Sequence, residues 1–169
     1  KSKLLFQMFS EDMEPEHWMI IAKEIEKEIK AGVDGVIITH GTDTMHYTSA
    51  ALSFMLQNLP IPVILVGSQR SSDRGSSDAF LNLVSAVNFI INSNFSGVAV
   101  CMHAHLNDDY CYIHSGVKVR KMHTSRRDAF KSINTEPIAK AWKDKIEIIN
   151  KSYHTKDKNR KLISKICFF

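Results

Sequence analysis

Three residues carry a hydroxyl, a carboxylate and an amine that could act together in general-base catalysis. Thr42 and Asp43 stand together in the segment HGTDT, and Lys121 stands in RKMHTSRRDAF. A carboxylate can orient a neighbouring hydroxyl, and a desolvated lysine can accept its proton. HGTDT lies where a predicted strand ends and a helix begins, which is where parallel sheets bind ligands. The residue types and their position are therefore suited to general-base catalysis.

Each of these local patterns also has a structural explanation. A Thr–Asp pair before a helix commonly caps that helix. The basic segment around Lys121 is equally typical of a loop that binds phosphate or RNA, or of solvated charge. Ser10 follows a predicted strand, where a serine often serves as a turn residue. The residue pattern alone leaves catalysis and these alternatives open.

The elements that position these residues alternate between apolar runs and amphipathic stretches. This alternation predicts an α/β fold in which helices cover parallel strands. The polar segment 107–127 predicts a hairpin over 111–119, followed by a basic loop over 120–127. The predicted strands are 4–9, 35–39, 62–67 and 97–102, and the predicted helices are 14–30, 45–56 and a third that ends near 92, with 76–78 as its cap.

Length and composition predict one soluble domain with a basic tail. The chain has 169 residues, of which 44% are hydrophobic, and no apolar run approaches the roughly 18 residues of a membrane span. We expect a cytoplasmic protein. Residues 1–136 are assigned to the domain, and the Lys-rich residues 137–169 to a tail that is either disordered or part of a linker. Such a tail either binds an acidic partner such as RNA or is merely solvated.

No metal or dinucleotide site is predicted. The histidines lack metal-site spacing, and the glycines do not form a GxGxxG motif. The three cysteines are interpreted as reduced and structural. Arg70, Asp73 and Arg74 either shape a pocket or an intersubunit contact or form surface ion pairs. The histidines expected to serve packing or loop hydrogen bonds are His40, His46, His103, His105, His114 and His123.

Three motifs, taken in their order and spacing, resemble the asparaginase/glutaminase family over about residues 4–134. They are HGTDTMHYT at 40–48, GSQRSSDRGSSDA at 67–79 and RKMHTSRRDAF at 120–130. Within that family they resemble the branch found in the archaeal Glu-tRNA(Gln) amidotransferases. Ordinary asparaginases carry a different sequence where SQRSSDR stands here. The resemblance implies the N-terminal, three-layer parallel-sheet domain of the asparaginase fold.

The resemblance also implies roles for individual residues. Thr42 matches the second of the family's two active-site threonines, while Asp43 and Lys121 match its aspartate and lysine. Lys121 would remove a proton from Thr42, and Asp43 would hold the lysine charge and bind the substrate α-amino group. Ser10 and Glu11 match the Ser–Gln pair that binds the amino-acid end of the substrate. Glu in place of Gln departs from ordinary asparaginases at the point of α-amino recognition.

The implied function is release of ammonia from the side-chain amide of glutamine or asparagine, for transamidation of Glu-tRNA(Gln). We expect no cofactor in this protein. A partner subunit of the E type would use ATP and Mg²⁺ and make most contacts with tRNA, and this protein would form a homodimer. The alternatives are a free-standing L-asparaginase and a catalytically inactive fragment that acts as a scaffold.

The family pattern also contains two parts that this sequence does not match. The family's other threonine, usually assigned as the nucleophile, follows the first strand in a Gly-rich turn, and the family has a smaller C-terminal domain. We therefore expect a chain that is truncated at its N-terminus and lacks the C-terminal domain. Alone, it would hydrolyse glutamine poorly, because a site without its nucleophile loses most of its rate advantage.

Overall fold

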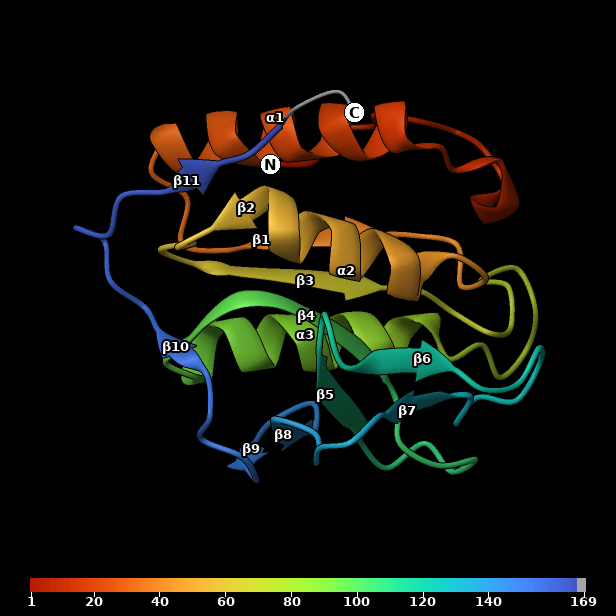
Figure 1. Cartoon of the computed structure of the whole chain (residues 1–169). Coiled ribbons are helices and arrows are strands. Elements are labelled where there is room, and N and C mark those ends of the chain that lie inside the picture. Colours follow the sequence, from red (N-terminus) through yellow and green to blue (C-terminus); the bar gives the residue numbers. More distant parts are fainter. Residues whose placement is uncertain (167–169) are drawn as a thin grey trace.

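A mixed sheet carries helices on both faces in the computed structural model, which describes residues 1–166 (Figure 1). The predicted α/β class is confirmed. The first three strands of the sheet are parallel and the later ones antiparallel, so the parallel sheet expected from the sequence forms only part of it. The strand order is β1 (Val36–Thr39), β3 (Pro62–Val66), β4 (Phe95–His103), β5 (Cys111–Ser115), β8 (Ala139–Ala141) and β9 (Ile146–Ile148), and β10 (His154–Thr155) pairs with the start of β4.

The three helices form close to where the hydrophobic spacing predicts them. They are α1 (Pro15–Lys30), α2 (Met45–Met55) and α3 (Ala79–Asn92). At the start of α1, the amide of Glu14 donates to the ring of His17 at 3.0 Å, and Pro15 occupies the first helical position, where its missing N–H costs nothing. Gly32, at a φ of +84°, follows the end of this helix.

Alternating residues of the central strands build two apolar cores. Val63 and Leu65 of β3 pack against α1 and α2, whereas Ile64 and Val66 pack against α3. This division follows from the period of two residues in a strand. β3 is buried along its whole length, as a strand covered on both faces should be. None of the helices within residues 1–166 is both long enough and apolar enough to cross a membrane.

The expected strand at 4–9 does not form. Residues 1–9 contain no helix or strand and lie against α1, where Lys1 pairs with Glu28 at 2.6 Å and Lys3 with Glu24 at 2.7 Å. A short 3₁₀ turn, η1 (Ser10–Asp12), follows. A strand needs a hydrogen-bonded neighbour, and a cavity separates this segment from the edge of β1. Residues 4–9 therefore have the apolar composition of a strand but form no β-ladder.

The structure also differs from the hairpin and loop expected at 111–127. β5 pairs with β4 and β8, while β6 (Val119–Lys121) pairs with β7 (Phe130–Ser132), so no hairpin forms within 111–119. Arg120 and Lys121 consequently lie on a strand, and only the following residues form the basic loop. Short strands with distant partners leave too few residues for a local pattern to identify those partners.

Part of the segment expected as a tail belongs to the fold. β8 and β9 extend the main sheet beyond β5, and β11 (Ile163–Ser164) pairs with β2 (Leu56–Gln57). Ala139 and Ala141 are fully buried, whereas Lys140 and Glu147 pair at 3.4 Å on the outer side. The domain boundary expected after residue 136 does not coincide with an edge of the sheet. The remainder of that segment, 167–169 with Cys167, lies outside the described residues.

Candidate active site

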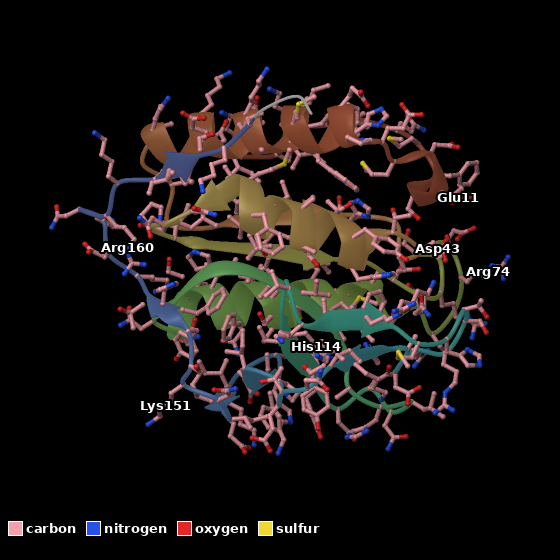
Figure 2. All side chains as sticks on the ribbon, viewed as in Figure 1. Glu11, Asp43, Arg74, His114, Lys151 and Arg160 are labelled. Atoms are coloured by element: carbon pink, nitrogen blue, oxygen red, sulfur yellow. The ribbon has the colours of Figure 1, made fainter. Side chains whose placement is uncertain are left out.

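Thr42, Asp43 and Lys121 meet at one end of the sheet. The turn of residues 40–44 connects β1 to α2, and Lys121 is the last residue of β6. The amine of Lys121 donates to Thr42 Oγ1 at 2.9 Å and to Asp43 Oδ1 at 2.7 Å. The fold thus joins two segments that lie far apart in the sequence. Figure 2 shows Asp43, Glu11 and Arg74 at this same end of the molecule.

The amine and the carboxylate of this ion pair differ in their exposure. The Lys121 side chain is 7% exposed, whereas that of Asp43 is 61% exposed. Thr42 is buried. A molecule approaching from solvent therefore reaches the carboxylate first, with the hydroxyl and the amine behind it. A shallow hollow of about 210 Å³ here is lined by Asp43, His46, Lys121, Met122, His123 and Thr124.

Ser10 holds η1 against the turn of residues 40–44. Its hydroxyl accepts the amide proton of Asp43 at 3.2 Å, and its carbonyl accepts the hydroxyl proton of Thr44 at 2.6 Å. This approach requires a glycine at position 41, because a Cβ there would lie 2.6 Å from the Ser10 Cβ. Of the two expected substrate-binding residues, Ser10 is buried within the turn and Glu11 is exposed beside it.

His40 fixes the base of the same turn. Its Nε2 lies 2.9 Å from Thr48 Oγ1, which also accepts the indole proton of Trp18 at 2.9 Å. Its Nδ1 lies 2.6 Å from the carbonyl of Gly41. Burial lowers the pKa of His40, although the contact with the Gly41 carbonyl opposes this shift. The contacts of this histidine correspond to the packing and loop role expected from the sequence.

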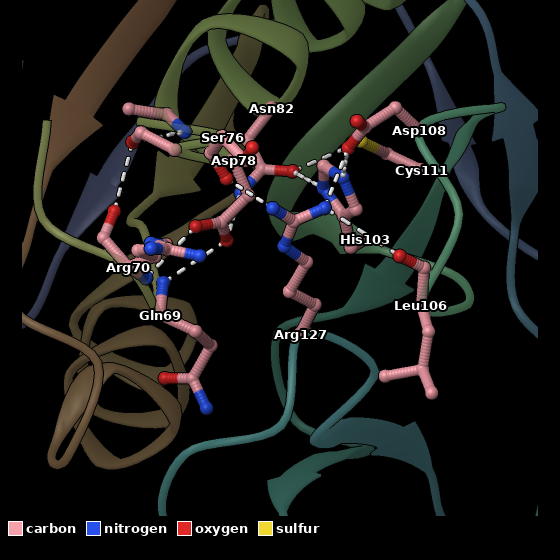
Figure 3. A network of polar contacts seen from close by, with 12 residues as sticks. Gln69, Arg70, Ser76, Asp78, Asn82, His103, Leu106, Asp108, Cys111 and Arg127 are labelled. Atoms are coloured by element: carbon pink, nitrogen blue, oxygen red, sulfur yellow. Dashed lines mark hydrogen bonds and ion pairs between the residues drawn. The ribbon is translucent and has the colours of Figure 1, made fainter. Parts of the chain in front are cut away.

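Asp78 organises the SQRSSDR loop, a role that the sequence did not reveal. Asp78 occupies the N-cap position of α3, within the cap expected at 76–78, but its side chain makes no cap hydrogen bond. Its buried carboxylate instead accepts the backbone amides of Gln69 and Arg70, each at 2.9 Å (Figure 3). It also accepts from Asn82 Nδ2 at 3.1 Å. The carboxylate therefore closes the loop over residues 69–78 onto the first turn of α3.

Side chains from this loop and its neighbours connect it to the segment after Lys121. Gln69 donates to the carbonyls of Thr124 at 3.3 Å and Arg126 at 2.8 Å. Arg127 pairs with Asp108 at 2.8 Å and also contacts the carbonyl of Ser76 (Figure 3). Two loops from distant parts of the chain thus contact the segment that follows β6. A side-chain amide that donates to two backbone carbonyls leaves no periodic signal in the sequence.

The remaining candidates lie outside this arrangement. Asp73 and Arg74 are exposed. Cys101 and Cys111 are free and buried in the core on the α3 side. Within residues 1–166, no group of three or more His, Cys, Asp or Glu side chains is placed to hold a metal ion.

Comparison with known proteins identifies a matching family model and several similar proteins. A family model described as "Asparaginase, N-terminal" matches residues 1–154. The chain is 60% identical over 154 residues to the D subunit of the glutamyl-tRNA(Gln) amidotransferase of Pyrococcus furiosus, a match that covers 90% of this chain and 35% of that protein. The corresponding protein of Pyrococcus abyssi is 58% identical over 154 residues, with coverage of 90% and 35%.

A solved structure has the same fold. The thermostable L-asparaginase from Thermococcus kodakarensis superposes with a TM-score of 0.83 at 33% identity, covering 96% of this chain and 46% of that one. The chain therefore spans about a third of the length of these curated relatives and less than half of this structure.

Proposed function

The chain belongs to the asparaginase family, and from that membership we propose that it forms part of an amidohydrolase active site that releases ammonia from glutamine or asparagine. The observation that carries the proposal is the contact of a buried amine with one hydroxyl and one carboxylate, formed by Lys121, Thr42 and Asp43. A proton relay needs these three groups in direct contact. A helix cap would need only Thr42 or Asp43, and would leave the buried lysine unexplained.

In the proposed reaction, Lys121 in its neutral form accepts the proton of the Thr42 hydroxyl, and the Thr42 oxygen takes the proton of the nucleophilic hydroxyl, which the family resemblance assigns to its other threonine. The nucleophile then forms a bond to the amide carbon, and the carbon–nitrogen bond breaks. The proton held by Lys121 returns through Thr42 to the departing ammonia. Water then gives a proton to the same relay and attacks the acyl carbon. The bond between that carbon and the nucleophile breaks, and the relay returns the proton to the nucleophile as the acid leaves.

The exposed carboxylate of Asp43 suits the substrate's α-ammonium group, while its other contact orients the lysine. Asp43 accepts from Lys121 through one oxygen and faces solvent with a largely exposed side chain. Ser10 contacts the backbone of Asp43 and Glu11 is exposed next to Ser10 in the chain, and both are proposed to bind the amino-acid end of the substrate. A glutamate at position 11 adds a second negative charge for the α-ammonium group.

We further propose that the ammonia serves transamidation of Glu-tRNA(Gln), with an E-type partner subunit that uses ATP and Mg²⁺ and makes most contacts with tRNA. Identity near 60% to proteins named as amidotransferase components, against 33% to an L-asparaginase, supports this role over that of a free-standing asparaginase. The protein would act as a homodimer and need no cofactor of its own.

Substitution of the lysine tests the amidohydrolase proposal. Ammonia release from glutamine and asparagine is measured with the protein as its gene encodes it, with and without the companion subunit. Lys121→Met should lower the rate by about a hundredfold or more, because the general base is lost. Lys118→Met, in the exposed turn before β6, is the matched control and should retain the rate. Equal rates for Lys121→Met and the parent protein would refute the assignment.

The amidotransferase role has a separate test. Formation of Gln-tRNA(Gln) is followed with Glu-tRNA(Gln), ATP, Mg²⁺, glutamine and the companion subunit, and free ammonia is then supplied in place of glutamine. Lys121→Met should abolish the glutamine-dependent product and spare the ammonia-dependent one. Rapid asparagine hydrolysis without the companion, together with no tRNA product, would favour the free-standing asparaginase.

A further inference from the structure

His103, the last residue of β4, is fully buried and has a polar partner at each of its two ring nitrogens. Nδ1 lies 2.5 Å from Asn82 Oδ1, and Nε2 lies 3.1 Å from Asp108 Oδ1 (Figure 3). A neutral imidazole carries one proton, so it can donate through only one of its nitrogens. The nature of the two partner atoms therefore decides whether this ring is neutral or charged.

The amide of Asn82 has its orientation set by two acceptors. Its Nδ2 donates to the carbonyl of Gly67 at 2.9 Å and to Asp78 Oδ2 at 3.1 Å. The carboxylate of Asp78 already receives two backbone amides of the SQRSSDR loop, so it acts as an acceptor. A reversed Asn82 amide would place its oxygen against both of these acceptor oxygens. The atom that faces His103 is therefore the amide oxygen, and Nδ1 of the ring must carry a proton.

The second partner, Asp108, is a carboxylate that can only accept. Its side chain is 62% exposed, and the oxygen that faces His103 also accepts from Arg127 at 2.8 Å. An exposed carboxyl group that is paired with a guanidinium is ionised at neutral pH. Nε2 of the ring must therefore carry a proton as well. With a proton on both nitrogens, the ring of His103 is an imidazolium.

The charged and titratable groups around the ring favour this charge. Burial opposes it, but the contacts with Cys111 and Asp108 and the charge of Asp78 raise the pKa of His103. The contact with His103, together with the charges of Arg127 and Lys143, lowers the pKa of Asp108. His103 therefore keeps its second proton to a higher pH than an ordinary histidine does. The groups that face this cluster are Asp78 at the start of α3, Cys101 of β4, Cys111 of β5, Asp108, Arg127 and Lys143.

Arg127 carries the contact with Asp108 into the β6–β7 loop. The amide of Met122 donates to the carbonyl of Ala129 at 2.7 Å, which closes that loop with Arg127 inside it. Residues 122–124 of the same loop line the hollow beside Lys121. A displacement of Arg127 would therefore reach the wall of the candidate site.

We propose that His103, held as an imidazolium, is a positioning residue that fixes the β6–β7 loop through Asp108 and Arg127. As a double donor, the charged ring ties Asp108 to Asn82 of α3, and Asp108 in turn holds Arg127. A neutral ring would lose one of its two contacts, and the exposed Asp108 is the partner that can turn toward solvent. The tie is complete below the pKa of His103 and is lost as pH rises through it. Its effect on substrate binding rests on the proposed function.

Nitrogen NMR tests the charge of the ring, with the protein as its gene encodes it, labelled with ¹⁵N-histidine. At pH about 7.5, an imidazole with the ordinary pKa of about 6.5 is mostly neutral. Both ring nitrogens of His103 should nevertheless carry a proton, whereas His154 on exposed β10 should be neutral and serves as the internal reference. The signals of His103 are assigned by their loss in His103→Gln. In Asp108→Asn, the ring should lose one of its two protons, because the negative partner is gone.

Hydrogen exchange measures the positioning without any assay of ammonia release. His103→Gln and Asp108→Asn should each speed exchange of the Met122 amide by about tenfold or more, because the β6–β7 loop loses its tie. His105→Gln changes an exposed histidine of the loop after β4 and should leave this amide as it is in the parent. Asp108 is exposed, so its variant tests the tie even if substitution of the buried His103 disturbs folding.

The KM for glutamine should carry the pH signature of the tie. At pH about 6.5, His103→Gln should raise KM about tenfold while kcat changes by less than about threefold, because the ring acts on the wall of the site and not on the reacting atoms. The KM values of variant and parent should converge as pH rises to about 9, where the parent ring has itself lost its proton. Their ratio removes the titration of glutamine and of Lys121, which both proteins share. His105→Gln should keep the parent KM throughout.

Other results would overturn the inference. A neutral His103 at pH about 7.5 would exclude the imidazolium. Loss of the second proton in Cys111→Ser but not in Asp108→Asn would assign the charge to a thiolate partner in place of the tie. Unchanged exchange of Met122 in both variants would show that the β6–β7 loop does not depend on His103. A KM ratio that is the same at every pH would leave His103 a merely structural role.

Failure of the proposed function would be distinguishable from failure of this inference. A protein that releases no ammonia from glutamine or asparagine would contradict the amidohydrolase proposal. The protons on the ring of His103 and the exchange rate of the Met122 amide would still decide whether the tie exists, because neither measurement requires turnover.

Discussion

At the residue scale, the candidate site depends on a lysine whose amine is buried between two partners. The hydroxyl of Thr42 and the carboxylate of Asp43 approach it from the same turn, at 2.9 and 2.7 Å. A buried amine must have its donors satisfied, so the loss of either partner changes both the position of the amine and its cost of burial. The loss of either partner of Lys121 should therefore affect both catalysis and the stability of the fold.

Thr42→Val separates the role of the hydroxyl from that of side-chain shape. Valine keeps the branched shape but removes the oxygen, so ammonia release should fall by about 10²- to 10⁴-fold as the proton relay is lost. Thr42→Ser retains the oxygen and should keep most of the rate. Steady-state ammonia release by both variants decides the matter, and similar rates for Thr42→Val and Thr42→Ser would exclude a proton relay through this hydroxyl.

We expect His114 to make the folded protein less stable in acid. Its ring is buried, Nδ1 lies 2.7 Å from Ser132 Oγ, and Nε2 has no hydrogen-bond partner within residues 1–166. Burial lowers the pKa of His114 to about 3 from 6.5, and the charge of Lys131 acts in the same direction. Between these values the unfolded chain binds a proton that the folded chain does not. Stability should therefore fall as pH decreases through this window, by about 1.4 kcal/mol per pH unit for this one group.

His114→Gln should remove that part of the pH dependence. Urea unfolding from pH 4 to 7 gives the slope of the unfolding free energy, which should be smaller in the variant by up to about 1.4 kcal/mol per pH unit. Lowered pKa values of His40 and His46 leave a residual slope of the same sign, whereas the raised pKa of His103 acts oppositely. His154→Gln, on exposed β10, is the control. An unchanged slope in His114→Gln would contradict the assignment.

At the scale of elements, loops after β3, β4 and β6 support one another at the end of the sheet. The side chains of Gln69 and Arg127 reach across from one loop to the next, and Asp78 closes the first loop onto α3. Lys121 stands at the end of the strand that leads into these contacts. The elements therefore hold the site through loop-to-loop hydrogen bonds as well as through the sheet.

Asp78→Ala should weaken this support. Two backbone amides and the amide of Asn82 would lose their acceptor in a buried position, at a cost of about 2–4 kcal/mol in the free energy of unfolding. Asp73→Ala changes an exposed carboxylate of the same loop and should stay within about 0.5 kcal/mol of the parent. Urea titration measures both. Equal stability of the two variants would show that the loop does not depend on Asp78.

At the scale of the whole molecule, the sheet continues into the C-terminal part of the chain. β8 pairs with β5, and Ile138, Ala139 and Ala141 complete the core on the α3 side. Asn88 of α3 donates to the carbonyls of Trp142 and Lys145, both at 3.0 Å, and so fastens the turn between β8 and β9. These residues belong to the structural unit that carries the site.

A chain that ends at residue 136 should therefore fail to fold cooperatively. The edge of β5 and part of the core would be exposed, and we expect loss of most of a free energy of unfolding that is about 5–15 kcal/mol for a typical domain. A chain that ends at residue 150 retains β8 and β9 and should unfold in one cooperative transition. Thermal unfolding and binding of a hydrophobic dye compare the two. Cooperative unfolding of the shorter chain would show that residues 137–150 are dispensable.

The sequence by itself determined the alternation of helices and strands from α1 to β4. Long periodic stretches such as α1 and wholly apolar ones such as β3 report burial directly, because one or both of their faces must leave water. The HGTDT turn also followed from the sequence, since it lies where an apolar run gives way to a helical pattern. The family motifs identified the candidate residues but not the distances between them.

Only the tertiary structure decided which segments pair. Residues 4–9 have the composition of a strand but no ladder, whereas Ala139–Ala141 has almost no strand signal and completes the sheet. The contact of Lys121 with Thr42, and the loop hydrogen bonds of Asp78 and Gln69, likewise join distant positions. A local pattern reports how a segment partitions between water and the core. Hydrogen-bond partners are set by the neighbours that the folded chain places beside each edge and each buried polar group.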